Sequence, residues 1–158
     1  MNTNGTTVKK NCSDHGWKLG EHGDWSKCTN WETDARVPLL IRAPWITPAV
    51  DVPKGDAAST MAMGELVDLF PTAVDLAGLP AVPSTEGLEG KSLVPVLKDP
   101  QGEHPERVAA FSQYPRCPQY NMKTQSTQWE CLQTPKANIT RMGYSVRTAE
   151  ARCELPCH

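Results

Sequence analysis

Residues 13–27 read SDHGWKLGEHGDWSK, and this stretch says more about fold and function than any other part of the sequence. It has neither a helical nor a strand period, and it combines an Asp-His pair, glycines and a lysine, which is typical of a functional loop. Asp14 offers a carboxylate to a hard divalent cation. Lys27 offers an ammonium to an anionic oxygen of sulfate or phosphate. The chemistry alone predicts a loop that binds a metal ion and an oxyanion.

The glycines of this loop are expected to let its backbone come close to a ligand. They are Gly16, Gly20 and Gly23. Each candidate residue also has a plainer explanation. Lys27 could be an ordinary solvated charge, His22 a structural histidine, and Trp17 and Trp25 simply parts of a core. The pattern favours function for Lys27 and leaves the other three open.

Length and composition indicate what class of protein contains this loop. The chain has 158 residues, 39% of them hydrophobic and 22% charged, which indicates one globular domain. A net charge of −2 gives no electrostatic footprint for nucleic acid or an anionic membrane. The longest apolar runs, such as residues 37–41, are far too short to span a bilayer. We therefore expect neither a nucleic-acid nor a membrane partner.

The cysteines and glycosylation sequons favour the secretory pathway. The chain has six cysteines, and N-x-S/T sequons occur at Asn4, Asn11 and Asn138. The first ten residues contain no apolar segment of a signal peptide, so a signal would lie on sequence outside this chain. Six ordinary thiols remain an equally good explanation from composition alone.

The clearest helix signal covers residues 61–79, where apolar side chains recur three and four positions apart. We expect this stripe to pack in a core. Pro71 interrupts the pattern and predicts either a kink or two abutting helices, with Pro71 in the first turn of the second. Gly78 provides the C-terminal stop. Residues 92–97 predict one or two further helical turns before Asp99-Pro100.

Strands are predicted by short apolar or alternating runs. Residues 37–42 predict a buried strand, and residues 108–114 a second strand. Residues 142–148 alternate, which places Tyr144 and Val146 on one face of a third. Residues 1–12 are polar and indicate at most a weak strand. Residues 115–137 form a long polar loop, and the residues from Arg152 onward have no period and are expected to be unfolded.

The element at residues 13–27 resembles the Ser-Asp-His-Gly-x-x-Leu-Gly-Glu-His-Gly-x-Trp-x-Lys motif of the sulfatase family, within the alkaline phosphatase superfamily. The resemblance continues through ELVDLFPT at 65–72 and GKSL at 90–93. SQYPR at 112–116 and MGYSVRT at 142–148 resemble a narrower branch, the sulfatases that act on 2-O-sulfated iduronate. The match covers roughly residues 13–150, in the C-terminal part of such an enzyme. Without the later pieces, a phosphodiesterase or another sulfatase would fit as well.

The resemblance implies an α/β fold, part of the alkaline-phosphatase-like sulfatase architecture. Residues 1–100 would be the C-terminal part of the catalytic subdomain, and residues 101–158 the truncated start of a smaller α+β subdomain. The implied activity is hydrolysis of the sulfate ester on 2-O-sulfated iduronate of heparan or dermatan sulfate, in the lysosome. Sulfated glycosaminoglycan is thus the implied substrate, and the N-terminal portion of the enzyme an implied partner.

The resemblance also assigns roles to individual residues. Asp14 and His15 match positions that help to hold one Ca²⁺ ion, and Lys27 matches a lysine that contacts the substrate sulfate. Trp17 and His22 would lie near the substrate. Because Ca²⁺ prefers oxygen ligands, Asp14 is the firmer of the two metal ligands.

The family nucleophile is absent from this sequence. Sulfatases use a formylglycine made within a Cys/Ser-x-Pro/Ala-x-Arg motif, and no cysteine or serine here has that context. The chain would supply about half of the metal shell and no catalytic nucleophile, so it is not expected to be active by itself. Formylglycine would belong to the complete enzyme only.

The remaining cysteines and one sequon carry secondary expectations. Cys117 and Cys131 close a loop short enough for a disulfide. Cys153 and Cys157 could pair, bind a metal with His158, or have no role. Asn138 is the candidate glycosylation site.

Two alternative functions belong to other classes. The chain could be a non-catalytic remnant that binds a cation or a sulfated glycan. It could also hold zinc, which prefers nitrogen and sulfur ligands. The zinc ligands would be Cys12, Asp14, His15 and His22.

Overall fold

The computed structural model describes residues 8–46, 59–105, 107–116, 131 and 134–157. The chain divides into two compact units, each described here by itself. The first unit comprises residues 1–12 and 38–110, and the second comprises residues 13–37 and 111–158. Among the described residues, no helix has the length and apolar character needed to cross a membrane.

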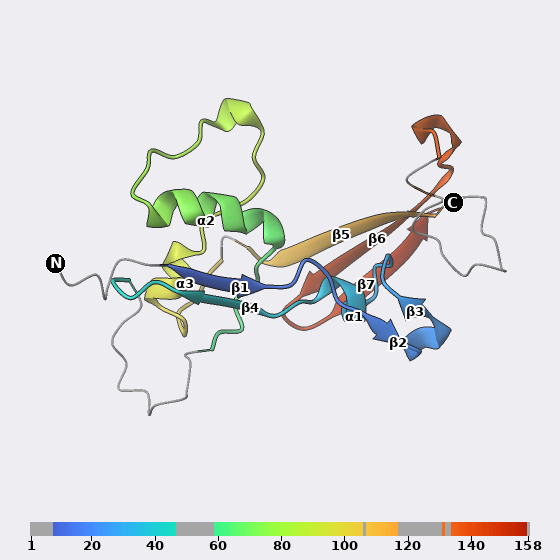
Figure 1. Ribbon diagram of the computed structural model, residues 1–158, viewed down its shortest axis with the longest axis horizontal. Coiled ribbons are helices and arrows are strands. Elements are labelled where there is room, and N and C mark those ends of the chain that lie inside the picture. The colour runs from blue at the N-terminus through green and yellow to red at the C-terminus, as the bar shows by residue number, and fades with distance from the viewer. Residues whose placement is uncertain (1–7, 47–58, 106, 117–130, 132–133, 158) are drawn as a thin grey trace. The chain divides into compact units, whose positions relative to one another are not determined.

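The first unit contains a two-stranded antiparallel sheet (Figure 1). Strand β1 (Lys9–Cys12) pairs with β4 (Leu39–Arg42), with Lys9 opposite Arg42 and Cys12 opposite Leu39. The weak N-terminal strand and the strand at 37–42 were both predicted, and both are confirmed. The predicted burial of β4 is wrong, because Leu40 is 55% exposed. A two-stranded ribbon can leave one face of its side chains in solvent, and here the exposed face of β4 includes Leu40 and Arg42.

The helical part of the first unit begins with the 3-10 turn η2 (Leu66–Asp68), which leads directly into α2 (Leu69–Leu76). The prediction of two abutting helices is confirmed, with Pro71 in the first turn of α2. The helical stretch begins later than the predicted residue 61. Gly78 has φ +66° and its N–H bonds to Asp75 O, while the Leu79 N–H bonds to Val74 O. This pair of bonds is the Schellman motif that a C-terminal glycine favours.

The apolar stripe of α2 is not buried in this unit, contrary to the core prediction. Phe70 is 57% exposed and Leu66 41% exposed, whereas Asp68 and Thr72 are buried. The buried face is therefore the polar one, because it faces the segment around Lys91 that donates hydrogen bonds to it. The apolar periodicity predicted the helix correctly, but it predicted burial of the wrong helix face.

A polar junction built on Asp68 holds η2, α2 and the segment at 90–93 together. Asp68 is fully buried and accepts hydrogen bonds from the N–H groups of Glu65 and Lys91, both at 2.8 Å, and an ion pair from Arg107. Thr72 Oγ1 accepts from the Leu93 N–H at 2.8 Å. The short helices η3 (Ser84–Glu86) and α3 (Val94–Lys98) complete the unit, and α3 confirms the helical turns predicted at 92–97.

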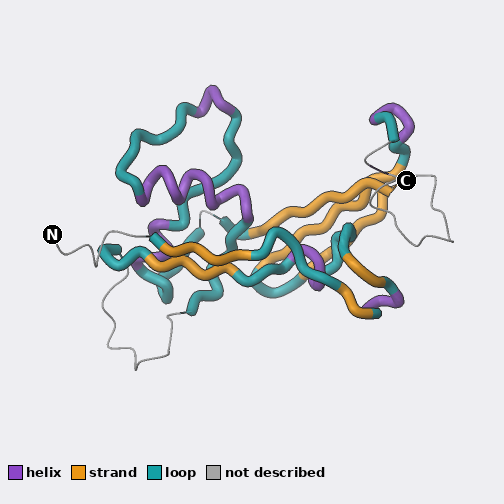
Figure 2. The backbone as a smooth tube through the Cα atoms, viewed as in Figure 1, coloured by secondary structure: helices purple, strands orange, loops and turns teal. Residues whose placement is uncertain are grey.

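The second unit contains a three-stranded sheet in the order β5-β6-β7, shown as neighbouring orange strands in Figure 2. Strand β5 (Ala109–Arg116) begins at the end of the first unit. A 3-10 turn η4 (Lys136–Asn138) precedes β6 (Arg141–Thr148). The strands predicted at 108–114 and 142–148 are confirmed. The buried side of β6 includes Ser145, whereas Tyr144 on the other side is 44% exposed.

The C-terminal segment was predicted to be unfolded, and this prediction is wrong. Strand β7 (Arg152–Cys157) pairs antiparallel with β6, from Arg147 opposite Arg152 to Met142 opposite Cys157. The pairing supplies backbone hydrogen bonds that the local sequence pattern does not reveal. Pro156 is compatible with the strand because β7 lies at the edge of the sheet, where one side of the backbone needs no partner.

Candidate functional site

Residues 13–37 form a small hairpin followed by one helical turn. Strands β2 (Lys18–Leu19) and β3 (Trp25–Ser26) pair antiparallel, with Lys18 opposite Ser26. The connection contains Gly20 at φ +119° and the 3-10 turn η1 (Glu21–Gly23), and it is closed by a 3.1 Å bond from the Gly20 N–H to Asp24 O. Helix α1 (Glu32–Ala35) follows. The motif at 13–27 is thus a hairpin rather than an irregular loop.

Three of the five predicted site residues come together next to this hairpin. The Nε2 atom of His15 lies 3.3 Å from an oxygen of Asp14 and 2.6 Å from the Lys27 ammonium. The Asp14 carboxylate is 85% exposed, and the His15 side chain is 31% exposed. A carboxylate, an imidazole and an ammonium therefore meet at one partly open point of the surface.

The contacts of His15 fix its tautomer. Nδ1 lies 2.7 Å from the carbonyl oxygen of Gly16, which can only accept, so Nδ1 carries the proton. Nε2 then has a free lone pair and accepts a hydrogen bond from the Lys27 ammonium. Imidazole nitrogen in this state can ligate a metal ion. A cation bound at Nε2 would have to replace the hydrogen bond from Lys27.

The backbone around Lys27 is held in an unusual conformation. Ser26 has φ +78° and Cys28 has φ +79°, so left-handed residues other than glycine flank Lys27 on both sides. Such residues cost energy and persist only where the surrounding structure determines them, which is often at functional sites. The conformation singles out Lys27 as a residue whose position the fold specifies.

Trp17 and His22, the other two predicted substrate residues, take different places. Trp17 is 56% exposed, and its ring centroid lies 6.4 Å from that of His15, tilted by 40°. The His22 ring instead stacks on Trp31, with centroids 4.0 Å apart and planes 7° apart. Trp17 therefore borders the Asp14–His15–Lys27 group, whereas the described ring contact of His22 is with Trp31.

Gly16 serves close packing within the chain. A Cβ atom at Gly16 would lie 1.7 Å from the carbonyl oxygen of Thr33, and the Gly16 N–H donates to Asp34 O at 2.8 Å. Gly20 and Gly23 provide left-handed turns. The structure thus gives all three glycines a role within the fold, beside the approach to a ligand that was expected of them.

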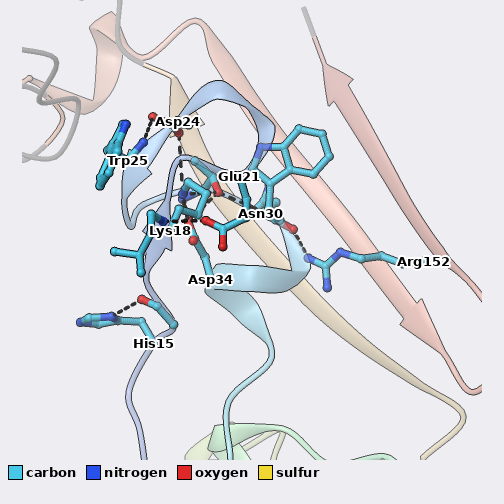
Figure 3. A network of polar contacts seen from close by, with 12 residues as sticks. His15, Lys18, Glu21, Asp24, Trp25, Asn30, Asp34 and Arg152 are labelled. Atoms are coloured by element: carbon cyan, nitrogen blue, oxygen red, sulfur yellow. Dashed lines mark hydrogen bonds and ion pairs between the residues drawn. The ribbon is translucent and has the colours of Figure 1, made fainter.

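The sequence interpretation missed a buried polar cluster beneath the hairpin (Figure 3). Lys18 is fully buried, and its ammonium lies 2.5 Å from Asp34 Oδ2 and 3.1 Å from Thr29 Oγ1. The same Asp34 oxygen accepts the Thr29 N–H at 2.9 Å. No local signal marks this cluster, because Lys18 and Asp34 are sixteen positions apart and each has the polarity of a surface residue.

A second polar group ties α1 to the sheet within the same unit. Arg152 donates to Glu32 at 3.0 Å, to the carbonyl oxygen of Asn30, and to Ser145 Oγ at 2.9 Å. Arg147 also lies 3.8 Å from Glu32. Figure 3 shows Arg152 reaching from β7 toward the loop at Asn30. The C-terminal strand, absent from the sequence prediction, thereby supports the segment that follows Lys27.

Among the described residues, a shifted pKa occurs at the hairpin tip, at Glu21. The Leu19 N–H donates to the Glu21 carboxylate at 2.6 Å and lowers the pKa of Glu21 below its ordinary value of 4.5. Glu21 is fully exposed, so this shift reports on local turn geometry rather than on a catalytic environment.

The secondary expectations can be placed in part. Cys131 forms a disulfide, but the predicted partner Cys117 lies outside the described residues, so their pairing stays a prediction. Cys153 is a free thiol, which rules out its pairing with Cys157. Asn138 is exposed at the end of η4, as a glycan acceptor must be.

The side chains near Asp14 bear on whether zinc or calcium could bind here. The described residues contain no group of three or more His, Cys, Asp or Glu side chains arranged to hold a metal ion. The zinc site of Cys12, Asp14, His15 and His22 is therefore not formed. Asp14 offers an exposed carboxylate, the type of ligand that Ca²⁺ prefers, whereas the neighbouring His15 Nε2 is engaged by Lys27. Ca²⁺ takes six to eight ligands, so the others would come from elsewhere.

Known proteins with similar sequences are sulfatases. Iduronate 2-sulfatase of Mus musculus is 34% identical over an alignment of 172 positions, which covers 89% of this chain and 30% of that protein. Iduronate 2-sulfatase of Homo sapiens is 34% identical over an alignment of 180 positions, which covers 93% of this chain and 32% of that protein. Arylsulfatase K of Danio rerio is 36% identical over 113 residues, covering 70% and 20%. The chain thus spans about a third of the length of the iduronate 2-sulfatases it matches. No protein-family model matches it.

Solved structures agree. BT4656 in complex with its substrate D-glucosamine-2-N,6-O-disulfate has a TM-score of 0.60 and 31% identity, over 90% of this chain and 24% of that one. The phosphonate monoester hydrolase of Agrobacterium radiobacter has a TM-score of 0.60 at 22% identity, over 96% and 28%, and shares the fold. The α/β, alkaline-phosphatase-like fold class inferred from the sequence is confirmed. This chain belongs to the sulfatase family, and it resembles a segment of iduronate 2-sulfatase.

Proposed function

We propose that this chain provides the Asp14–His15–Lys27 side of the active site of a sulfatase of the iduronate 2-sulfatase type. The substrate would be the sulfate ester of 2-O-sulfated iduronate in heparan or dermatan sulfate. The single observation that carries the proposal is the meeting of Lys27 with His15 at 2.6 Å and of His15 with Asp14 at 3.3 Å. These three residue types are the ones needed to hold a cation and a sulfate together.

Each residue has a role that follows from its chemistry. Asp14 and His15 would be two ligands of one Ca²⁺ ion, the carboxylate through oxygen and the imidazole through Nε2. When bound, the ion would supply positive charge beside the sulfate oxygens. Lys27 would leave Nε2 and direct its ammonium to a sulfate oxygen, where it offsets negative charge that develops in the transition state. Exposed Trp17 would lie beside the sugar, with His22 farther along the hairpin.

The nucleophile must come from other residues than these 158. No cysteine or serine of this chain has the Cys/Ser-x-Pro/Ala-x-Arg context in which formylglycine forms. We therefore propose that the chain acts together with an N-terminal portion of the enzyme that carries formylglycine and the remaining metal ligands, and that it has no turnover alone. Residues 1–100 would complete the catalytic subdomain, and residues 101–158 would begin the C-terminal one.

Similarity and sequons support the proposed setting. The two iduronate 2-sulfatases align with about nine-tenths of this chain. The exposed sequon at Asn138 and the disulfide at Cys131 suit an oxidising, glycosylating route. We propose a lysosomal glycoprotein that degrades glycosaminoglycan.

Calcium binding by the 158-residue chain gives the first test. Titration of Ca²⁺, followed by nuclear magnetic resonance, should shift the signals of Asp14 and His15 and break the contact between Lys27 and His15. Asp14→Asn should abolish the response. The control is Asp75→Asn, an exposed aspartate of the first unit whose carboxylate accepts the Ser92 hydroxyl, and this variant should leave the response intact. An equal response in both variants would refute the metal assignment.

Complementation gives the second test. Adding an N-terminal sulfatase portion that contains formylglycine should produce turnover of an aryl sulfate, and both Asp14→Asn and Lys27→Met should remove most of it. Binding of Ca²⁺ and a sulfated disaccharide without turnover in the complemented protein would favour the second candidate, a non-catalytic remnant that binds cations or sulfated glycans.

A further inference from the structure

The fully buried Lys18 has no part in the proposed chemistry, and this raises the question of what it does. Burying an ammonium is costly unless it is paired and hydrogen-bonded, and an apolar residue of similar volume often serves stability equally well. Lys18 meets Asp34 at 2.5 Å and Thr29 at 3.1 Å. These partners lie on the segment immediately after Lys27, so the pair is placed to control that lysine.

We propose that Lys18 and Asp34 are positioning residues, a buried clamp that holds the backbone on both sides of Lys27 so that its ammonium reaches His15. Only the expected effect of this clamp on catalysis rests on the proposed function. The clamp itself is defined by contacts among described residues of the second unit.

The first half of the clamp is the hairpin. The backbone of Lys18 pairs with Ser26, the residue immediately before Lys27. Its side chain passes beneath the hairpin to Thr29 Oγ1, two residues after Lys27. One residue therefore holds the chain before and after the short arch of Lys27 and Cys28.

The second half is Asp34. Its Oδ2 accepts the Thr29 N–H at 2.9 Å and the Thr29 hydroxyl at 2.5 Å, in addition to the Lys18 ammonium. Its Oδ1 is buried and has no hydrogen-bond partner among the described residues. Every described contact of the Asp34 carboxylate is thus with Lys18 or Thr29.

The clamp accounts for the left-handed residues on each side of Lys27. Ser26 at φ +78° and Cys28 at φ +79° would relax to extended conformations if nothing held them. The fixed points at Ser26 and Thr29 prevent this relaxation. If the clamp opens, the arch can extend, and the Lys27 ammonium leaves the His15 ring.

The decisive comparison is between Thr29→Ser and Thr29→Val in the 158-residue chain. Serine keeps the hydroxyl between Lys18 and Asp34, whereas valine removes it at nearly constant shape. The readout is the nuclear Overhauser contact between the Lys27 methylene next to Nζ and the His15 ring, measured with a folded amide spectrum as a check. We expect wild type and Thr29→Ser to keep the contact and Thr29→Val to lose most of it.

A second variant separates positioning from stability. Lys18→Met with Asp34→Leu replaces the ion pair by apolar side chains, so the chain should fold while the anchor of Thr29 is lost. We expect a folded protein without the Lys27–His15 contact. A folded double variant, or a folded Thr29→Val, that retains the contact would overturn the proposal and leave the pair as packing alone.

Hydrogen exchange of the wild-type chain requires no variant to fold. The Thr29 amide, bonded to Asp34, should be as protected as the paired amides of β2 and β3. Exchange of Thr29 at the rate of an open loop would also overturn the clamp. Neither readout uses Ca²⁺ or sulfate, so a failure of the proposed function would appear as an absent Ca²⁺ response with the Lys27–His15 contact intact.

Discussion

Among the residues that the structure describes, two aspartates are buried, one in each unit, and they differ in which carboxylate oxygens have partners. Both carboxylate oxygens of Asp68 have partners. Oδ1 accepts the Lys91 N–H and pairs with Arg107, and Oδ2 accepts the Glu65 N–H. Asp34 has its described partners on Oδ2 alone. Asp68 joins three segments of ordinary backbone, whereas Asp34 stabilises the strained arch that carries Lys27. A carboxylate with partners on both oxygens suits a junction between several segments. A carboxylate with described partners on one oxygen suits the stabilisation of a single local conformation.

Removing the carboxylate of Asp68 is expected to have the largest effect. Asp68→Ala removes one of the two carboxylates described beside the guanidinium of Arg107, which is 13% exposed, and it removes the described acceptor of the Glu65 and Lys91 N–H groups. Breaking a buried ion pair by removing one partner costs roughly 3–5 kcal/mol of unfolding free energy. Urea unfolding followed by circular dichroism would measure it. Asp75→Ala is the control, since the side chain of this exposed residue accepts only the Ser92 hydroxyl among its described partners, and should cost about 1 kcal/mol.

Alanine at Gly16 and Gly90 tests whether close packing is equally strict in the two units. A Cβ would lie 1.7 Å from Thr33 O at Gly16 and 2.1 Å from Val67 O at Gly90. Backbone must move in both cases, and we expect losses of roughly 2–3 kcal/mol in unfolding free energy. Gly23→Ala is the control, because no atom lies within 4 Å and only its φ of +71° opposes the change. It should cost about 1 kcal/mol. Equal losses at all three positions would contradict the packing argument.

Two substitutions at His22 separate strain from stacking at the hairpin tip. His22 has φ +59° and stacks on Trp31. Alanine loses the stacking and keeps the strain, whereas glycine loses the stacking and relieves the strain. We expect His22→Gly to be more stable than His22→Ala by about 1 kcal/mol in thermal or urea unfolding. The opposite order would show that the left-handed conformation is not imposed by the hairpin.

The smallest effect is a pH dependence at the exposed tip. The Leu19 N–H lowers the pKa of Glu21, so its carboxylate is favoured in the folded state. The resulting stabilisation is fully present above the ordinary value of 4.5 and is lost as pH falls through the lowered pKa. Wild type minus Glu21→Gln should therefore give a small positive difference in unfolding midpoint at neutral pH that disappears in acid. A difference independent of pH would exclude this carboxylate as its source.

The comparison of the two aspartates also shows where sequence reasoning succeeds. The helix from Leu66 to Leu76 and its stop at Gly78 follow from local spacing, since each signal lies within a few residues of the structure it causes. Burial did not follow, because Phe70 occupies a core-like position in the sequence pattern and is nevertheless 57% exposed in the structure. Asp68 and Asp34 were missed as buried residues, since only distant partners make their burial tolerable.

The sequence by itself determined the family motif at 13–27, the existence of the strands predicted at 37–42, 108–114 and 142–148, and the choice of Asp14, His15 and Lys27 as candidates. Local residue order encodes these features. Tertiary structure decided that the three candidates meet, that Arg152 begins a strand, and that Lys18 is buried against Asp34. Those outcomes depend on contacts between residues many positions apart, and the free energy of such contacts cannot be read from either segment alone.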